Sequence, residues 1–149
     1  MSLLVRRLKV LDIPALENLE REIVERHPGR RGWLDTYRKH IERSMSEEPE
    51  GFFVADLNNI VVGGAIVRQR GPHPLTGDKH GQLLALTASP AYVRYNVAQR
   101  LVLEASLYLK SRGCKSMTVS CPVDTDPKEI DIFKTSGFAV VSWELEKQL

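Results

Sequence analysis

The sequence LTASPAYVRYNVAQRLV, residues 86–102, decides the fold of this chain. Residues 82–88, which lead into it, are apolar in both phases, and this pattern predicts a central strand covered on both faces. Pro90 ends that strand. Residues 94–111 follow helical spacing and Gly113 is a typical C-cap, so we predict a long amphipathic helix directly after the strand.

The elements on either side follow from alternation, helical spacing and turn residues. The pair Asn58-Asn59 tolerates positive φ and predicts a tight hairpin, whereas residues 71–81 hold two prolines and predict an exposed loop. The predicted strands cover residues 3–10, 52–57, 60–68, 82–88, 116–121 and 138–145, and the predicted helices cover about 13–26, 34–45, 94–111 and a short stretch ending at 136. The order βααβββαβαβ indicates a mixed α/β fold with a central mixed sheet flanked by helices.

The first predicted helix starts after Asp12, which we interpret as its N-cap. Its inward stripe is predicted to consist of Ile13, Leu16, Leu19 and Ile23.

The composition favours a single globular domain over residues 1–149. The chain is 42% hydrophobic and 27% charged with a formal net charge of +2, which argues against a dedicated nucleic-acid binder. No apolar run approaches the ~20 residues of a membrane span, and charged residues interrupt the N-terminal stretch where a secretion signal would be apolar. Cys114 and Cys121 flank a predicted strand on opposite faces, so they predict neither a disulfide nor a zinc site. We therefore expect a cytoplasmic protein that binds neither a membrane nor nucleic acid and holds no metal.

The central segment resembles the GNAT superfamily of N-acetyltransferases, and the predicted element order matches that family along nearly the whole chain. Pro90 aligns with the proline of the family's V-x-P-like step, and Ser136-Gly137-Phe138 is similar to its terminal GF pair. The pyrophosphate-binding loop Q/R-x-x-G-x-G/A falls on Val93, Arg94, Tyr95, Asn96, Val97 and Ala98, of which only Ala98 matches the pattern outright.

The resemblance implies acetyl-CoA as co-substrate. Backbone groups of Leu86, Thr87 and Ala88 would pair with its pantetheine arm, which inserts between the fourth and fifth strands. Successive N–H groups at a helix N-terminus attract an anion whatever the side chains are. Asn96 stands where glycine is usual and is one of the few residues that tolerate positive φ.

The proton-handling residues depart from the family pattern. Phe133 stands where many members carry a tyrosine near the departing thiolate, and Asp126 stands where asparagine is usual. Cys121 and Tyr95 are the candidate replacement donors. Two of these residues also have a purely structural interpretation: Cys121 would be a small core hydrophobe and Phe133 a core aromatic.

His80, at the entrance of the fourth strand, is the candidate base, because an imidazole titrates near neutral pH. It lies close in sequence to His73. Both residues are also typical of a solvated loop, in which case water would carry the proton.

The acceptor side would be formed by the loop between the first two helices and by the C-terminus. That loop is basic with one aromatic residue, and its candidate contacts are Arg26, His27, Arg30, Arg31 and Trp33. After Phe138 only one strand fits where many family members have a hairpin, so either the last strand is missing or a second subunit completes the sheet edge.

The sequence thus predicts transfer of an acetyl group to a primary amine by direct attack within a ternary complex. The acceptor would be a small molecule or a peptide, and the protein a monomer or homodimer. The alternative is a non-catalytic GNAT-fold CoA sensor or interaction module, because positions 93, 96, 126 and 133 have all drifted from the pattern.

Overall fold

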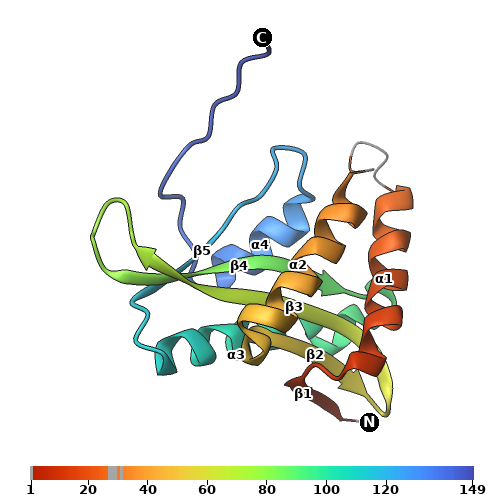
Figure 1. The fold of residues 1–149 in the computed structure, drawn as a ribbon. Coiled ribbons are helices and arrows are strands. Elements are labelled where there is room, and N and C mark those ends of the chain that lie inside the picture. Colours follow the sequence, from red (N-terminus) through yellow and green to blue (C-terminus); the bar gives the residue numbers. More distant parts are fainter. Residues whose placement is uncertain (1, 27–29, 31) are drawn as a thin grey trace.

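One mixed sheet forms the centre of the molecule. The computed structural model describes residues 2–26, 30 and 32–149. Within them the strands lie in the order β1-β2-β3-β4-β5 (Figure 1). They span Leu3–Arg7, Phe52–Leu57, Ile60–Pro72, Lys79–Ala88 and Ser116–Val119. The first four pair antiparallel and β5 pairs parallel with β4. The mixed α/β fold expected from the sequence is therefore confirmed.

Helices cover both faces of this sheet (Figure 1). Helices α1 and α2 lie on one face, whereas α3 and α4 lie on the other. The helices span Ile13–Arg26, Trp33–Glu47, Val97–Ser111 and Pro127–Thr135, and short 3-10 turns cover Val10–Asp12, Pro49–Gly51 and Pro90–Tyr95. None of the described helices has both the length and the apolar character needed to cross a membrane.

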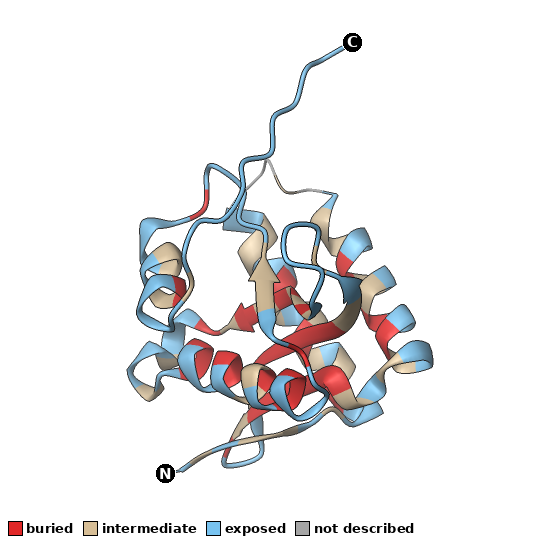
Figure 2. Ribbon diagram, turned by 90° about the vertical axis from the view of Figure 1, so that its left-hand side faces the viewer, coloured by how far each residue is buried: buried red, intermediate tan, exposed pale blue. Residues whose placement is uncertain are grey.

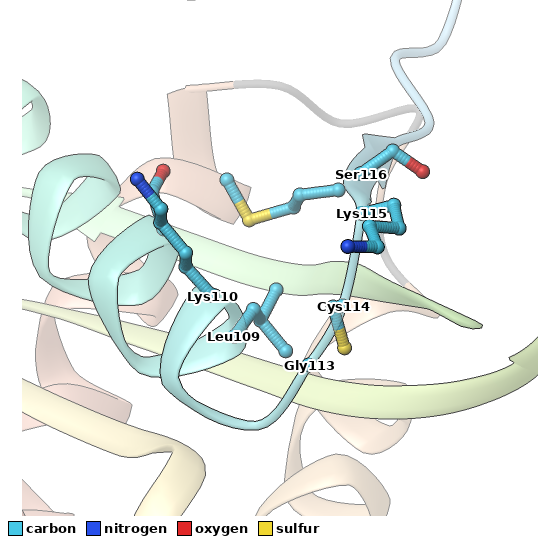
Figure 3. Close-up of a pocket in the computed structure, with 8 residues that line it drawn as sticks. Leu109, Lys110, Gly113, Cys114, Lys115 and Ser116 are labelled. Carbon is cyan, nitrogen blue, oxygen red and sulfur yellow. The ribbon is translucent and has the colours of Figure 1, made fainter. Parts of the chain in front are cut away.

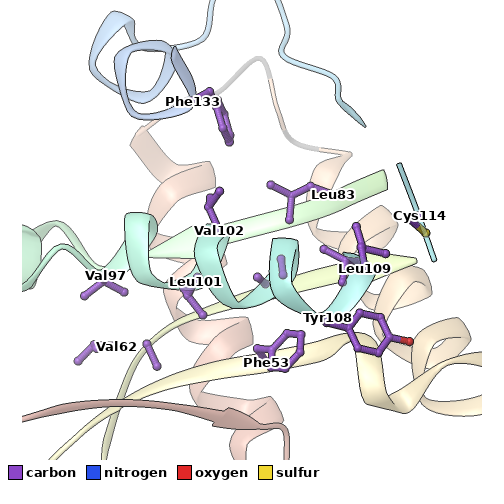
Figure 4. Packing of buried hydrophobic residues seen from close by; sticks show 14 of the residues in the cluster. Phe53, Val62, Leu83, Val97, Leu101, Val102, Tyr108, Leu109, Cys114 and Phe133 are labelled. Atoms are coloured by element: carbon purple, nitrogen blue, oxygen red, sulfur yellow. The ribbon is translucent and has the colours of Figure 1, made fainter. Parts of the chain in front are cut away.

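Each face has its own hydrophobic core (Figure 2). On the α3 face, Leu101 and Val102 pack with Leu83 of β4, and Phe133 points towards them from α4 (Figure 4). On the other face, Leu16 of α1 is completely buried in the second cluster. The central strands are thus covered on both faces, as their apolar pattern predicted.

The hairpin between β3 and β4 is longer than the sequence suggested. Its register runs on to the pair Pro72 and Lys79, so the exposed loop is confined to the residues between them. Asn58 and Asn59 have φ values of 50° and 69°, which confirms the tight turn predicted between β2 and β3.

Asp12 does not act as predicted from the sequence. Its carboxylate accepts hydrogen bonds from the Lys9 N–H, at 2.7 Å, and from the Arg6 guanidinium, at 2.8 Å. Both partners precede it in the chain. The carboxylate therefore stabilises the entry turn Val10–Asp12 and anchors it to β1.

The final strand predicted over residues 138–145 is wrong. These residues are all described, and none of them forms a strand. Val141, Trp143 and Leu145 are exposed, and the segment leaves the body of the molecule as an extended tail (Figure 1). Alternating apolar residues need a partner strand to form a sheet, and in this single chain β5 remains the edge strand.

A β-bulge in β4 changes which face of the sheet its last side chains point to. Ile66 pairs with Ala85 and Val67 pairs with Leu83, so Leu84 has no partner on β3. An extra residue reverses the alternation of side chains along a strand. Leu83 accordingly packs in the α3 core, whereas Ala85 packs with α1 and α2.

Candidate active site

Strands β4 and β5 part where the candidate site begins. Their parallel register ends at the pair Leu83 and Val119, one residue before the bulge at Leu84. From there to Ala88, strand β4 keeps its partner β3 on one side and has lost β5 on the other. A strand in this position offers unpaired backbone groups to an extended ligand.

Helix α3 begins beside the end of β4. Asn96 precedes its first residue with φ 55° and ψ 42°, which confirms the positive φ expected where glycine is usual. Val97 and Ala98 are buried beneath the turn, whereas the side chains of Val93, Arg94 and Asn96 are exposed. The loop therefore combines an apolar anchor with open N–H groups at the positive end of a helix.

Tyr95 is partly covered in the same turn. The Arg94 guanidinium lies 4.9 Å from the centre of its ring, and one of its nitrogens lies 3.4 Å from the phenol oxygen. The Arg94 side chain is exposed, whereas the Tyr95 ring packs against the hydrophobic cluster on the α3 face.

A cavity of about 340 Å³ lies next to this loop. It is lined by Ile23, Arg26, Pro90, Val93, Asp126 and Lys128. The structure thus brings together Val93 and Asp126, two residues predicted separately from the resemblance. Asp126 caps α4, since its carboxylate accepts a hydrogen bond from the Lys128 N–H at 2.9 Å. Arg26 and Lys128 give the cavity a positive character that suits phosphate.

The two candidates from the fifth strand and the last helix have different surroundings. Phe133 is 5% exposed and packs against Phe138 with ring centres 5.4 Å apart, so it is a core aromatic without a proton to give. Cys121 is an exposed free thiol two residues beyond β5, which does not fit a core hydrophobe. Local packing around the sulphur and the negative charge of Glu129 raise the pKa of this thiol, so it stays protonated at neutral pH.

His80 lies at the opposite end of β4 from Thr87 and Ala88. Its Nδ1 lies 2.7 Å from the Gly71 carbonyl oxygen and its ring packs against His73. Seven residues of strand separate His80 from Thr87, which amounts to roughly 23 Å. The structure therefore separates this candidate base from the end of the strand where the other candidates gather.

A buried carboxylate that the sequence reading missed lies at that end. Glu20 of α1 is 3% exposed and faces β4. It accepts hydrogen bonds from the Thr87 hydroxyl and from the Trp33 indole N–H, the latter at 2.8 Å. Its sequence signal was its position one turn after Leu16 in the apolar stripe, where a charged residue has no ordinary place.

Burial raises the pKa of Glu20 above its ordinary value. The hydrogen bonds from Thr87 and Trp33 act in the opposite direction but do not offset the loss of water. Negative Glu129 also raises this pKa, and positive Arg30 lowers it. Glu129 and Arg30 act on Cys121 as well, so Glu20 and Cys121 share one electrostatic environment.

The basic loop between α1 and α2 is only partly described. His27 and Arg31 lie outside the described residues. Arg26 lines the cavity, and a guanidinium nitrogen of Arg30 lies 3.6 Å from a carboxylate oxygen of Asp124. Trp33 packs against Tyr37 with ring centres 6.1 Å apart. The loop therefore contributes an aromatic wall and an ion pair close to Glu20.

A second cavity, about 480 Å³ in volume, is lined by a different set of residues (Figure 3). Leu109, Gly113 and Met117 line it where α3 ends and β5 begins. Because the Lys115 N–H bonds to the Lys79 carbonyl at the start of β4, this cavity lies near the His80 end of the sheet. It contains none of the candidate site residues. Across the described part of the chain, no cluster of three acidic, histidine or cysteine side chains could hold a metal ion.

Comparison with known families identifies the type of enzyme. The model of the acetyltransferase (GNAT) family matches residues 14–138. The chain belongs to the GNAT acetyltransferase family. This confirms both the resemblance stated from the sequence and the enzyme class expected from it, an N-acetyltransferase.

Solved structures agree with the fold at low sequence identity. AAC(6')-Iy, an aminoglycoside N-acetyltransferase solved with a bisubstrate analogue of CoA, is 14% identical with a TM-score of 0.78 over 100% of this chain and 99% of its own. Glucosamine-6-phosphate N-acetyltransferase from Arabidopsis thaliana is 13% identical with a TM-score of 0.72, covering 99% of both chains. Aminoglycoside 6'-N-acetyltransferase AAC(6')-IG from Acinetobacter haemolyticus is 11% identical with a TM-score of 0.74, over 100% of this chain and 98% of its own. None of the curated protein sequences matches the chain.

Proposed function

We propose that this protein transfers the acetyl group of acetyl-CoA to a primary amine by direct attack within a ternary complex. The observation that carries the proposal is the divergence of β4 and β5 beyond Leu83, directly beside the N-terminus of α3. The opening would accept the pantetheine arm along residues Leu86, Thr87 and Ala88. The turn at Val93–Ala98 would hold the pyrophosphate, with Arg26 and Lys128 as nearby cations.

The acceptor is proposed to be a small molecule or a peptide carrying a primary amine. The aminoglycoside and glucosamine-6-phosphate enzymes named above act on compounds of the first kind, and their fold supports this reading. We further propose a cytoplasmic location, one domain over residues 1–149, and a monomer or homodimer.

Acetyl-CoA should raise the melting temperature of the protein. At a concentration one hundred times its Kd, a ligand adds ~2.7 kcal/mol of stability, which is roughly 5–10 °C for a domain of this size. Thermal melts with acetyl-CoA, with CoA and with free pantetheine measure this directly. A melting temperature that does not move with millimolar acetyl-CoA would rule out cofactor binding.

Release of free thiol from acetyl-CoA across a panel of primary amines then tests turnover. A binding protein that acetylates no amine would support the sensor alternative. The buried Phe133, which has no proton to give, is the observation that favours this alternative.

Cys121 is proposed to protonate the departing thiolate. The substitution Cys121→Ala should lower kcat by about tenfold or more while leaving the KM for acetyl-CoA unchanged, because only the reaction step loses its proton donor. Steady-state kinetics measure both constants. Cys114→Ala removes the chain's other thiol, near the start of β5, and should leave kcat intact. An unchanged kcat in Cys121→Ala would reject the assignment.

A further inference from the structure

The strongest unused group in the molecule is the buried carboxylate of Glu20. Among the described residues, no lysine or arginine nitrogen forms an ion pair with it. Arg30, the nearby cation, pairs with Asp124 instead. A buried carboxylate without a cation is costly to a folded protein, and either a bound proton or a positively charged ligand would compensate its charge.

The hydrogen bonds to Glu20 orient it towards the reacting end of β4. Thr87, which is completely buried, donates from the residue directly before Ala88. The bulge at Leu84 makes this contact possible, because uninterrupted alternation from Leu83 would turn Thr87 to the α3 face. Trp33 donates from α2 on the other side. The carboxylate is therefore fixed by one donor on the strand and one on the helix.

Glu20 lies one helical turn from the cavity beside the acetyl-CoA loop and is not one of the residues that line it. Ile23, three residues further along the same face of α1, lines that cavity together with Pro90 and Val93. Glu20 and this cavity, which is proposed to take the phosphates, are therefore neighbours on α1, one helical turn apart.

Resting on the proposed function, we infer that Glu20 binds the acceptor as an ammonium ion and takes one of its protons. Glu20 removes a proton from R–NH3⁺, and the freed nitrogen lone pair attacks the thioester carbonyl carbon. The C–N bond forms, the C–S bond breaks, and the CoA thiolate leaves with a proton from Cys121. The second nitrogen proton replaces, through solvent, the one that Cys121 gave. The products are the amide, CoA thiol and a proton on Glu20.

The acceptor class follows from this site. Glu20 selects a cationic primary amine, and the half-buried ring of Trp33 lies against the same carboxylate. Within the described residues, the charged and titratable groups that act on Glu20 are Arg30 from the loop, Tyr37 from α2 and Glu129 from α4. Burial and the charge of Glu20 raise the pKa of Tyr37, so Tyr37 stays neutral and Glu20 is the group that titrates.

The substitution Glu20→Gln tests the inference. It keeps the shape and removes the negative charge; the amide oxygen can still accept from the Trp33 N–H, and the Thr87 hydroxyl must turn to accept from the amide NH2. We expect kcat/KM for cationic amines to fall at least about 100-fold, the rise of kcat/KM with pH to disappear, and the acetyl-CoA melting shift to persist. Glu22→Gln, an exposed change of the same kind on the same helix, is the matched control and should behave as wild type. If Glu20→Gln had the kcat/KM and the pH profile of the wild type, the inference would be overturned.

A second readout does not depend on turnover. The chain has two tryptophans, and Trp143 is 85% exposed in the tail, so Trp143→Phe leaves Trp33 as the sole reporter beside Glu20. Fluorescence of Trp33 should titrate with pH, lysine amide should shift this midpoint to lower pH, and Glu20→Gln should abolish the transition. Failure of wild type to bind acetyl-CoA refutes the proposed function alone, whereas a Trp33 signal indifferent to lysine amide overturns the role of Glu20.

Discussion

Replacing Gly63 by alanine is expected to destabilise the protein by about 3 kcal/mol, a large share of a typical folding free energy. A Cβ at this position would lie 2.5 Å from the Thr87 carbonyl oxygen and 2.7 Å from a methyl carbon of Val97. The first contact is with backbone, so no side chain can rotate away to relieve it. The smaller backbone entropy of unfolded alanine offsets at most ~1 kcal/mol of this cost.

The same substitution should weaken acetyl-CoA binding. Gly63 pairs with Ala88 and touches the first residue of α3, so relief of the clash must separate the end of β4 from the helix N-terminus. Urea unfolding measures the stability, and the acetyl-CoA melting shift measures the binding. Gly71→Ala is the matched control on β3, because a Cβ there has open space around it. Equal stabilities of the two variants would contradict the close approach at Gly63.

The fold could be predicted from the sequence because its signals are local. The apolar run before Pro90, the helix that follows and the Asn58-Asn59 turn each constrain their own segment. The predicted last strand failed for the opposite reason. The alternation in residues 138–145 shows that the segment could form a strand, but a strand also needs an edge to join, and alternation cannot supply one.

From the sequence, the candidate site could be predicted only where it is formed by backbone groups. Asn96 and the end of β4 were found because a turn and a strand end leave marks in the sequence. Glu20 was missed because the helical stripe was assigned from its apolar residues alone. Leu16 and Ile23 define the inward face, and the charged residue between them is an exception to it. Its partner Thr87 depends on the bulge at Leu84, which shifts the side-chain phase without any glycine or proline to announce it.

The buried Glu20 should make the protein less stable as pH rises. Because burial raises its pKa in the folded state, the folded protein holds a proton that the unfolded chain has already released at the same pH. Stability is therefore lost between the ordinary glutamate pKa and the higher folded-state pKa, by about 1.4 kcal/mol for each unit between them. Above that window the loss is complete.

Glu20→Gln cannot ionise, so it should escape this loss. Its stability relative to wild type should rise through the same pH window and remain higher at pH 7, in contrast to its expected loss of activity. Urea unfolding of both proteins from about pH 4 to 8 gives the difference at each pH. Other groups cancel in that difference, including Asp12, whose pKa is lowered by the Arg6 guanidinium and which loses its contribution in acid. A stability difference that does not change with pH would mean that Glu20 titrates normally, and the charge assigned to the amine site would then have no energetic basis.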